Sequence, residues 1–327
     1  MIVTVTPNPS IDRTATLPGP LVRGGVVRVT SVSNEPGGKG VNVARALTLA
    51  GLEAVAVLPA GEQDPILAGL RAQGVRFRAV PVASPVRTNL AITEPDGTTT
   101  KVNEPGAVLS PNEAEALTQA VVELGQAADW VVLSGSLPPG LPDSWYSEMV
   151  ALLHPHDCRV AVDTSDRPLG ALAAGLDRAA PDLLKPNAEE LAGLVGVSAD
   201  TLEVAVRDGD AGPVVVAARR LLDRGVGAVL ATLGAAGAVL VDGSGAWVAT
   251  PPPIEPRSTV GAGDSALAGY VRADVAGATA PDRLRMAVAY GSAATALPGS
   301  ALPSPNQLNL NDVSVTPVVG ALPEGEL

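Results

Sequence analysis

The stretch "STVGAGDSALAGYV" (258–271) joins a glycine-rich turn to a predicted helix and places one acid, Asp264, at the junction. The helix is predicted to start near Ala262 because apolar residues follow at helical spacing: Leu267, Tyr270, Val271 and Val275. The first amides of a helix have no intrahelical partner and lie at the positive end of its dipole. Gly261 and Gly263 leave these amides uncovered. The turn can therefore hold phosphate oxygens without a lysine.

Asp264 has two explanations. An acid in the first turn of a helix is stabilised by the helix dipole and needs no further role. Alternatively, Asp264 is a catalytic base that accepts the proton of an attacking hydroxyl. Phosphoryl transfer has a loose transition state, so a weakly basic carboxylate is adequate. On either explanation, the helix amides are expected to keep the pKa of Asp264 low.

Short apolar runs alternate with stretches of helical period along the rest of the chain. Strands are expected at 2–6, 54–58, 130–133, 159–162, 183–184 and 228–232. Helices are expected near 40–50, 65–73, 111–125, 143–153, 187–195 and 213–224. This alternation predicts an α/β fold with a mostly parallel sheet and helices on both faces. Ligands of such sheets bind at the carboxyl ends of the strands.

Two segments interrupt the alternation. Residues 12–33 and 87–103 contain no good helix, and the second resembles a hairpin around a Pro-Asp-Gly turn. They are expected to form a small separate sheet that serves as a lid on a single α/β domain spanning 1–327. Residues 198–212 are expected to be a solvated acidic insertion, and the tail after Pro317 is expected to be loose.

The composition limits the possible functions. The net charge of −12 argues against nucleic-acid binding, and an anionic substrate would need a local cluster of cations, amides or metal. The longest apolar run, 225–241, contains four glycines and fits two core strands better than a membrane span. Cys158 is the single cysteine, and the first residues do not resemble a signal peptide. We therefore expect a cytoplasmic protein.

A second glycine-rich segment, "NEPGGKGVNVARAL" (34–47), surrounds Lys39 and opens a predicted helix. It is not a Walker A loop, because no Ser or Thr follows the lysine. The glycines fit either an ordinary strand–helix turn or a ligand site. Asn42 and Arg45 favour a ligand site, since both lie near the start of the helix.

Two further segments follow predicted strands. In "LLKPNAEELAGL" (183–194), Asn187 and Glu190 form either a plain capping box or a hydrated Mg²⁺ site. The segment "ATLGAAGAVLV" (231–241) is either a simple hairpin or a turn whose amides contact a nucleotide.

Several remaining charged residues also have two explanations. Arg87 and Lys101 flank the predicted hairpin. They are either solvated charges at a strand edge or two cations that bind a phosphate group together. His154 and His156 are expected in a surface loop and not in a metal site, because no Cys, Asp or Glu accompanies them at ligand spacing.

Together these segments resemble the PfkB (ribokinase-like) family of carbohydrate kinases, from residue 1 to about 310. "GGKGVNVARAL" is similar to the first family signature and "STVGAGDSALAG" to the second, which is highly specific. Within the family, the closest resemblance is to bacterial 1-phosphofructokinases and tagatose-6-phosphate kinases. The segments that indicate this branch are "VTPNPSID", "SGSLPPG" (134–140), "KPNAEEL" and "TLGAAGAV".

The resemblance implies roles for individual residues. Asp264 would be the base, and the anion hole would consist of the amides of Gly261, Ala262 and Gly263. The sugar would be bound by Asp12, Gly38, Lys39 and Asn42, and its phosphate by Arg87, Lys101 and Ser136. The ATP phosphates and nucleotide would contact Lys185, Asn187, Thr232, Gly234, Gly237 and Gly263. Mg²⁺ would be held, through water, by Asn187 and Glu190.

The activity that the resemblance implies is ATP-dependent phosphorylation of a sugar phosphate. The first expectation is transfer to O6 of fructose 1-phosphate, and the alternatives are tagatose 6-phosphate and fructose 6-phosphate. A different class of function, a non-catalytic sugar-phosphate sensor on the same fold, is also considered. By analogy with the family we expect a homodimer formed through the lid, with no nucleic-acid or membrane partner.

Overall fold

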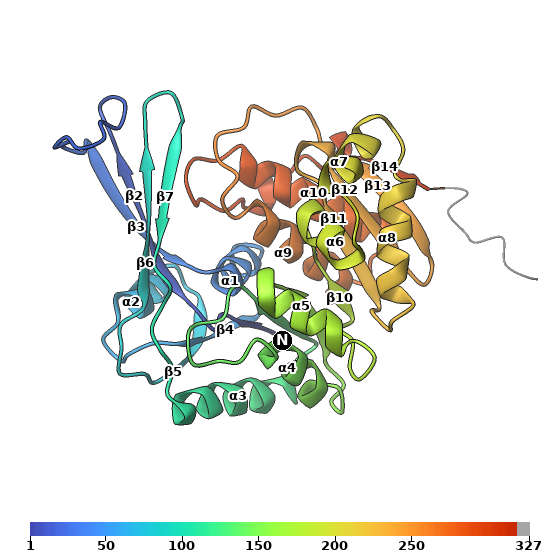
Figure 1. Ribbon diagram of the computed structural model, residues 1–327, viewed down its shortest axis with the longest axis horizontal. Helices are drawn as coiled ribbons and strands as arrows, with labels where there is room; N and C mark the ends of the chain where they lie inside the picture. The colour runs from blue at the N-terminus through green and yellow to red at the C-terminus, as the bar shows by residue number, and fades with distance from the viewer. Residues whose placement is uncertain (319–327) are drawn as a thin grey trace, which may run out of the picture.

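One large sheet runs through the molecule (Figure 1). The structure is a computed structural model and describes residues 1–318. Within that range, the sheet contains β1 (Ile2–Val5), β4 (Ala54–Pro59), β5 (Arg76–Val80), β8 (Trp130–Ser134), β9 (Arg159–Asp163), β10 (Leu183–Leu184), β11 (Ala228–Thr232), β12 (Ala238–Asp242), β13 (Gly245–Thr250) and β14 (Ser314–Pro317). The order is β14-β13-β12-β11-β10-β9-β8-β1-β4-β5. From β11 to β5 every neighbouring pair is parallel, as predicted, and β12 to β14 are antiparallel.

Helices cover both faces of this sheet, which confirms the predicted fold class. One face is covered by α1 (Lys39–Leu49), α2 (Pro65–Ala72), α9 (Ala262–Val275) and α10 (Ala280–Thr295). The other is covered by α3 (Pro111–Gly125), α4 (Trp145–Leu153), α5 (Asp166–Gly175), α6 (Ala188–Val195), α7 (Ala199–Arg207) and α8 (Gly212–Leu222).

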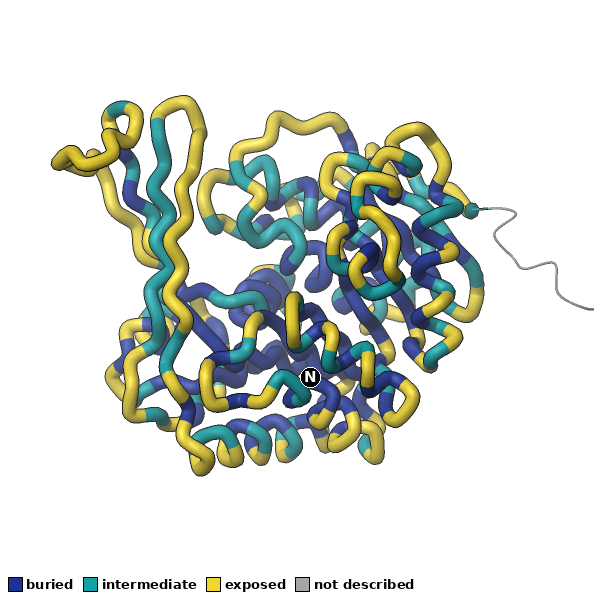
Figure 2. The backbone as a smooth tube through the Cα atoms, in the orientation of Figure 1, coloured by how far each residue is buried: buried dark blue, intermediate teal, exposed yellow. Residues whose placement is uncertain are grey.

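The strands supply two cores by simple alternation. On β8, Trp130 and Val132 face the core beneath α1 and α9, while Val131 and Leu133 face the core beneath α3 and α4. Successive side chains of a strand point to opposite faces, so a continuous apolar run is required when both faces are buried. Figure 2 shows these strands as the most deeply buried part of the chain.

A second, smaller sheet projects from the main body at the upper left of Figure 1. Its strands are β2 (Ser10–Thr16), β3 (Ser31–Gly37), β6 (Arg87–Thr93) and β7 (Thr99–Asn103), in the order β3-β2-β6-β7. The predicted hairpin is confirmed: β6 and β7 are antiparallel, with Asn89 opposite Asn103. Much of this sheet is exposed or half-buried (Figure 2). We call it the small sheet.

One local prediction was wrong. Residues 198–212 are not a solvated insertion, because they contain α7 and the start of α8. Leu202 and Val206 lie one helical turn apart and are buried against the main core, while the acids face outward. The segment contains an amphipathic helix. Its many acidic residues made the apolar stripe difficult to recognise in the sequence.

Some helices were not predicted, and one predicted segment lies outside the described residues. Helices α5 and α10 had not been predicted. Except for Val318, the tail after Pro317 lies outside the described residues. Within residues 1–318, no helix combines the length and the apolar character that crossing a membrane requires.

Candidate active site

Ser136 and Lys185, two of the predicted site residues, lie where the strand order changes direction. From β1 the chain adds β4 and β5 on one side of the sheet, then returns to add β8 to β11 on the other. Open α/β sheets bind ligands outside the carboxyl ends of their strands at such a reversal. Ser136, Asp163 and Lys185 follow or end β8, β9 and β10 there.

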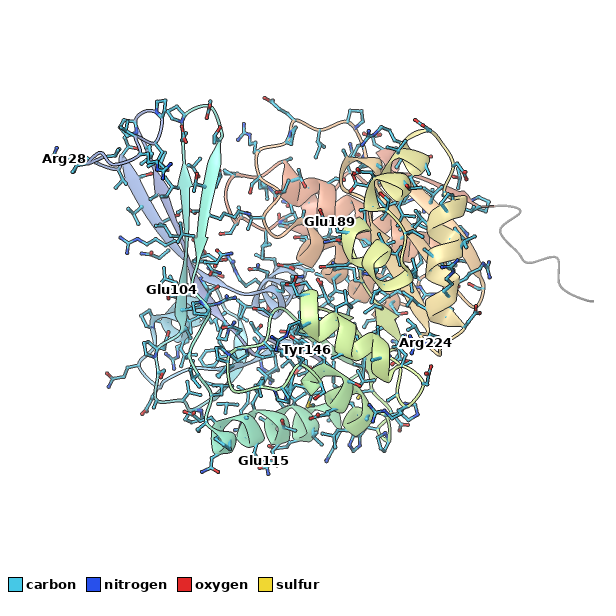
Figure 3. All side chains as sticks on the ribbon, in the orientation of Figure 1. Arg28, Glu104, Glu115, Tyr146, Glu189 and Arg224 are labelled. Atoms are coloured by element: carbon cyan, nitrogen blue, oxygen red, sulfur yellow. The ribbon has the colours of Figure 1, made fainter. Side chains whose placement is uncertain are left out.

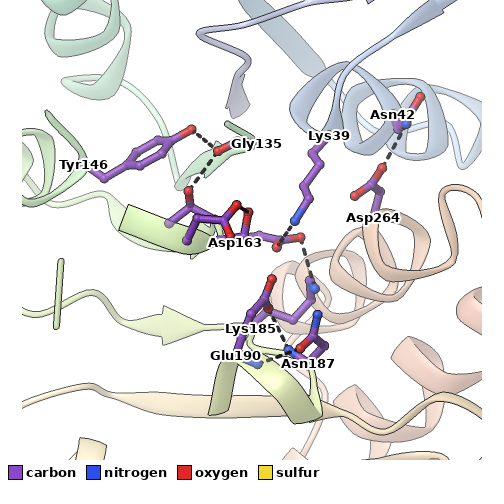
Figure 4. Close-up of polar contacts among 12 residues, drawn as sticks. Lys39, Asn42, Gly135, Tyr146, Asp163, Lys185, Asn187, Glu190 and Asp264 are labelled. Carbon is purple, nitrogen blue, oxygen red and sulfur yellow. Dashed lines mark hydrogen bonds and ion pairs between the residues drawn. The ribbon is translucent and has the colours of Figure 1, made fainter. Parts of the chain in front are cut away.

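Asp264 lies in the first turn of α9, and Asn42 on α1 faces it. The side-chain amide of Asn42 donates a hydrogen bond to Oδ2 of Asp264 at 2.9 Å (Figure 4). Asp264 is 7 % exposed, so its carboxylate is largely buried. Gly261 caps the helix with φ +75°, a left-handed conformation that favours glycine. The predicted turn, helix and acid are therefore all present.

The predicted low pKa of Asp264 was wrong. Burial, and then the negative charge of Asp163, raise its pKa to about 6. The hydrogen bond from Asn42 and the charges of Lys39 and Lys185 act in the opposite direction and do not compensate. A proton acceptor with this pKa is better matched to neutral pH than the expected weak base.

Asp163 joins two lysines from different parts of the chain. Its Oδ1 lies 2.9 Å from Nζ of Lys39 and its Oδ2 lies 3.1 Å from Nζ of Lys185 (Figure 4). Asp163 is 1 % exposed. Burial acts to raise the pKa of Asp163, but the positive charges of Lys185 and Lys39 outweigh it and hold the pKa below its ordinary value. This cluster leaves one net positive charge within an acidic protein.

Lys185 also reaches the glycine turn. A Cβ atom built on Gly263 would lie 3.3 Å from Nζ of Lys185, so the ammonium group lies beside the first turn of α9. Lys39 begins α1 directly after Gly38, whose φ of +106° turns the chain into that helix. The structure thus brings together uncapped helix amides, a base and two lysines.

Asn187 and Glu190 form the capping box that the sequence predicted as one alternative. Asn187 Oδ1 accepts from the amide of Glu190, and Glu190 Oε2 accepts from the amide of Asn187, both at 2.8 Å. Burial raises the pKa of Glu190 despite that bond. Within residues 1–318, no group of three or more His, Cys, Asp or Glu side chains could hold a metal ion, and this includes His154 and His156.

The glycine-rich turn after β11 lies beside Asn187. The amide of Thr232 donates to the carbonyl of Pro186 at 3.0 Å, and Asn187 pairs with Thr232 in a parallel bridge. Gly234 and Gly237 flank the short turn between β11 and β12, which form the predicted hairpin. The two segments predicted to contact a nucleotide are therefore adjacent.

Asp12 lies on β2 of the small sheet. Its Oδ1 accepts hydrogen bonds from Oγ of Ser10 at 2.8 Å and from Nδ2 of Asn89 at 3.2 Å. A Cβ atom on Gly37 would lie only 2.3 Å from Cγ of Asp12, so the backbone of Gly37 lies directly against this carboxylate. Asp12 is thus held in place on the side of the small sheet that joins the large one.

Arg87 and Ser136 are brought together, whereas Lys101 is not. One guanidinium nitrogen of Arg87 lies 3.4 Å from Oγ of Ser136, and another donates to the carbonyl of Glu104, whose position Figure 3 marks. Lys101 lies opposite Ala91, four residues beyond Arg87 along the hairpin, which is about 13 Å at strand spacing. Its side chain is exposed. Arg87 and Lys101 therefore do not form the predicted two-cation phosphate site in this structure.

Sequence reasoning missed two residues of this region, Asp163 and Asn89. A signal for Asp163 was available, because an acid that directly follows the apolar run 160–162 points to the ligand-binding edge. Asn89 carried no such signal within the hairpin. Its contact with Asp12 arises from the parallel pairing of β2 and β6, two strands far apart in sequence.

Comparisons with known proteins identify the family of this chain. Residues 6–307 match the family described as pfkB family carbohydrate kinase. The chain is 38 % identical to a 1-phosphofructokinase of Rhodobacter capsulatus, covering 94 % of each chain. It is 34 % identical to the ATP-dependent 6-phosphofructokinase isozyme 2 of Escherichia coli, over 92 % of this chain and 94 % of that one.

Solved structures show the same architecture. Phosphofructokinase-2 from Escherichia coli, crystallised with substrates and products, superposes with a TM-score of 0.83 at 33 % identity, covering 94 % of this chain and 96 % of that one. A ribokinase from Thermotoga maritima, 18 % identical, shares the fold with a TM-score of 0.72 over 94 % and 97 % of the two chains. The fold is ribokinase-like, and the chain belongs to the pfkB family of carbohydrate kinases.

Proposed function

We propose that this protein is a 1-phosphofructokinase. It transfers the γ-phosphoryl group of ATP to O6 of fructose 1-phosphate, giving fructose 1,6-bisphosphate and ADP. The observation that carries the proposal is the meeting of Asp264, the uncapped amides of α9 and the ammonium group of Lys185 at one edge of the sheet. The relative with 38 % identity supports the choice of acceptor.

Asp264 accepts the proton from O6 as that oxygen bonds to phosphorus and the bond to the leaving ADP oxygen breaks. The hydrogen bond from Asn42 orients the carboxylate, and its raised pKa makes it a competent acceptor near neutral pH. The amides of Gly261, Ala262 and Gly263 stabilise the negative charge on the transferring group.

Lys185 supplies local positive charge that a protein of net charge −12 needs in order to bind ATP, and Lys39, which is predicted to bind the sugar, contacts the other oxygen of the same Asp163 carboxylate. Asp163 holds both ammonium groups and neutralises part of their charge when no substrate is bound. The adjacent segments at Asn187 and at Thr232 to Gly237 form the proposed surface for the nucleotide.

The residues proposed for Mg²⁺ fit a hydrated ion and not a directly coordinated one. Oε2 of Glu190 is occupied by the capping bond, and no hydrogen bond to Oε1 occurs within the described part of the chain. Mg²⁺ retains several waters and needs few protein oxygens. Glu190 and Asn187 would hold such an ion through its waters, and the ion would neutralise charge on the ATP phosphates.

At the sugar end, Asp12 and Asn42 bind hydroxyl groups and Arg87 with Ser136 binds the 1-phosphate. Lys101 completes this phosphate site when the small sheet moves toward the main body. We propose that the small sheet is therefore a lid, and that closure excludes water that would otherwise accept the phosphoryl group.

The outer face of the small sheet supports a homodimer. Val32 and Val102 are 42 % and 55 % exposed, and they line a hollow of about 470 Å³ together with Arg13, Ala15, Thr88, Leu90 and Glu104. An exposed apolar patch of this kind is typical of an interaction surface.

The single cysteine and the substrates of this reaction are consistent with a location in the cytoplasm.

The test is an ADP-release assay with MgATP and a panel of acceptors: fructose 1-phosphate, fructose 6-phosphate, tagatose 6-phosphate, ribose and adenosine. We expect the highest kcat/KM with fructose 1-phosphate. A preference for fructose 6-phosphate or tagatose 6-phosphate would keep the chemistry and change the acceptor. Calorimetric binding of a sugar phosphate without ADP release would favour the non-catalytic sensor.

A further inference from the structure

Arg45 is a buried cation that has no role in the proposed reaction. It lies on α1 one turn after Asn42 and is 8 % exposed. The sequence suggested that it would face a ligand, yet its guanidinium group makes four hydrogen bonds within the protein. It donates to Oε1 of Gln73 at 2.6 Å, to Oε2 of Glu35 at 3.0 Å and to the carbonyl of Pro36 at 3.1 Å. Burying an arginine with this many partners points to a specific role.

The fourth partner of Arg45 is the side chain of Asn42. A guanidinium nitrogen of Arg45 donates to Oδ1 of Asn42 at 3.3 Å, while Nδ2 of Asn42 donates to Asp264 at 2.9 Å. An amide has one accepting end and one donating end, whereas a guanidinium group can only donate and a carboxylate can only accept. The Asn42 amide therefore satisfies both neighbours in one orientation only. Rotation by 180° would set oxygen against carboxylate and NH₂ against guanidinium.

The other end of this chain of contacts is in the small sheet. Glu35 lies on β3, where it is paired with Asp12 of β2 in the register of the small sheet. Gln73, at the end of α2, donates to the same oxygen of Glu35 at 2.8 Å. Arg45 is thus the link between a strand of the small sheet and the amide that contacts Asp264.

We propose that Arg45 is a positioning residue for Asp264: it fixes the orientation of the Asn42 amide and, through Glu35, ties that orientation to the place of strand β3. The proposal rests on the proposed role of Asp264 as the base. It assigns to Arg45 no contact with substrate. Loss of the guanidinium group frees the Asn42 amide to rotate, and Asp264 loses its fixed donor.

The first test is steady-state kinetics of Arg45→Met, Asn42→Ala and the double variant with fructose 1-phosphate and MgATP. We expect Arg45→Met to lower kcat about 10- to 100-fold, because small misplacements of a catalytic group have effects of this size. The KM for ATP should stay within about twofold. In the Asn42→Ala background, Arg45→Met should change kcat less than about threefold. An equal loss in both backgrounds would show that Arg45 does not act through Asn42.

The second test does not need turnover. The pKa of the Asp264 carboxyl is measured by ¹³C NMR titration in the wild type and in Arg45→Met. We expect a higher value in the variant, because the donor from Asn42 is lost while Asp163, Lys39 and Lys185 still face Asp264. An unchanged pKa together with an unchanged kcat would overturn the proposal. If no acceptor in the panel is phosphorylated, the proposed function fails while this titration still decides the role of Arg45.

Arg272→Met is the matched control. Arg272 lies on the same helix as Asp264 and donates to the hydroxyl of Tyr290 at 2.9 Å, at the far end from the site. Its loss should lower the melting temperature but leave kcat and the pKa of Asp264 within error. If Arg45→Met does not fold, Arg45→Lys retains the charge beside Glu35 but cannot reach all four partners. It should then show the same kinetic and titration changes.

Discussion

Nδ2 of Asn42 donates to Oδ2 of Asp264 at 2.9 Å across 222 residues of sequence. The bond joins the two glycine-rich segments, 34–47 and 258–271, at the starts of two helices that pack against each other. Each segment alone permits an ordinary structural explanation. Their convergence on one carboxylate, with two lysines nearby, supports the catalytic interpretation more strongly than either segment does.

Asp264→Asn should lower kcat by about 10²- to 10⁴-fold, since a general base contributes an effect of this size. Asn is nearly isosteric and can still accept the hydrogen bond from Asn42, so binding of fructose 1-phosphate should persist. ADP release measures the first effect and isothermal calorimetry the second. Turnover within threefold of wild type would remove Asp264 from the role of base.

Activity should fall on the acidic side of pH about 6. Asp264 must be ionised to accept a proton, and burial together with Asp163 raises its pKa to about 6. Below that pH, log kcat should fall with a slope near one in a pH series at constant ionic strength. Phosphate monoesters also titrate at about pH 6, so the shift of this limb in Asp163→Asn, described below, distinguishes Asp264 from the substrates.

The same carboxylate should make the wild type less stable than Asp264→Asn at pH 8. The rise in pKa from 3.8 to about 6 corresponds to up to about 3 kcal/mol against the ionised form in the folded state. As the pH falls from 6 to 4, the folded wild type takes up a proton that the unfolded chain does not, so the difference should shrink. Urea unfolding at pH 8, 6 and 4.5 measures it. A wild type that is equally stable or more stable at pH 8 would contradict the assigned burial.

Asp163→Asn should destabilise the protein by about 3 kcal/mol, because it leaves the buried Lys185 and the half-buried Lys39 without their shared partner. It should also move the acidic limb of the pH profile to lower pH, since the charge of Asp163 is one of the causes that raise the pKa of Asp264. Chemical unfolding and the pH series measure the two effects.

Asp143→Asn is the control for that substitution. Asp143 pairs with Arg167 at 2.7 Å on the surface, where the arginine is 83 % exposed. Exposed ion pairs contribute little, so the change in unfolding free energy should stay below about 1 kcal/mol and the pH profile should not move. Equal effects at both positions would mean that the contacts of Asp163 with the two lysines stabilise the fold no more than a surface ion pair does.

The strands and most helices could be predicted because their signals are local. The run from Trp130 to Leu133 is apolar throughout because both faces of a central strand are buried, and that is visible in sequence. The helix at 199–207 was missed because acids surround its buried stripe of Leu202 and Val206. The acidic composition of the segment favoured a solvated loop. The two apolar residues indicate a helix only once their packing against the main core is known.

The errors at the site arose from contacts between distant segments. The helix dipole predicts a low pKa for Asp264, but burial and then the negative charge of Asp163 raise the pKa instead. Neither is visible from residues near 264. Lys101 was grouped with Arg87 because both flank a hairpin, yet strand register sets them apart by about four residues. The sequence was enough to predict which residues belong to the site. It was not enough to predict the distances between their side chains.

Lys101 provides a test of whether the small sheet closes over the sugar phosphate. In this structure Lys101 is exposed, and no ion pair of its ammonium group occurs within residues 1–318. If the small sheet closes, Lys101→Met should raise the KM for fructose 1-phosphate about tenfold and leave the KM for ATP unchanged. Arg87→Met should raise the same KM at least as much, because Arg87 already lies beside Ser136.

Arg28→Met is the control for these two variants. Arg28 lies at the tip of the small sheet, pointing away from the main body (Figure 3), and its loss should change neither KM. An effect of Arg28→Met equal to that of Lys101→Met would indicate a general loss of positive charge and not a phosphate contact. An unchanged KM in Lys101→Met, with a raised KM in Arg87→Met, would leave the phosphate site in place and exclude closure of β7 over it.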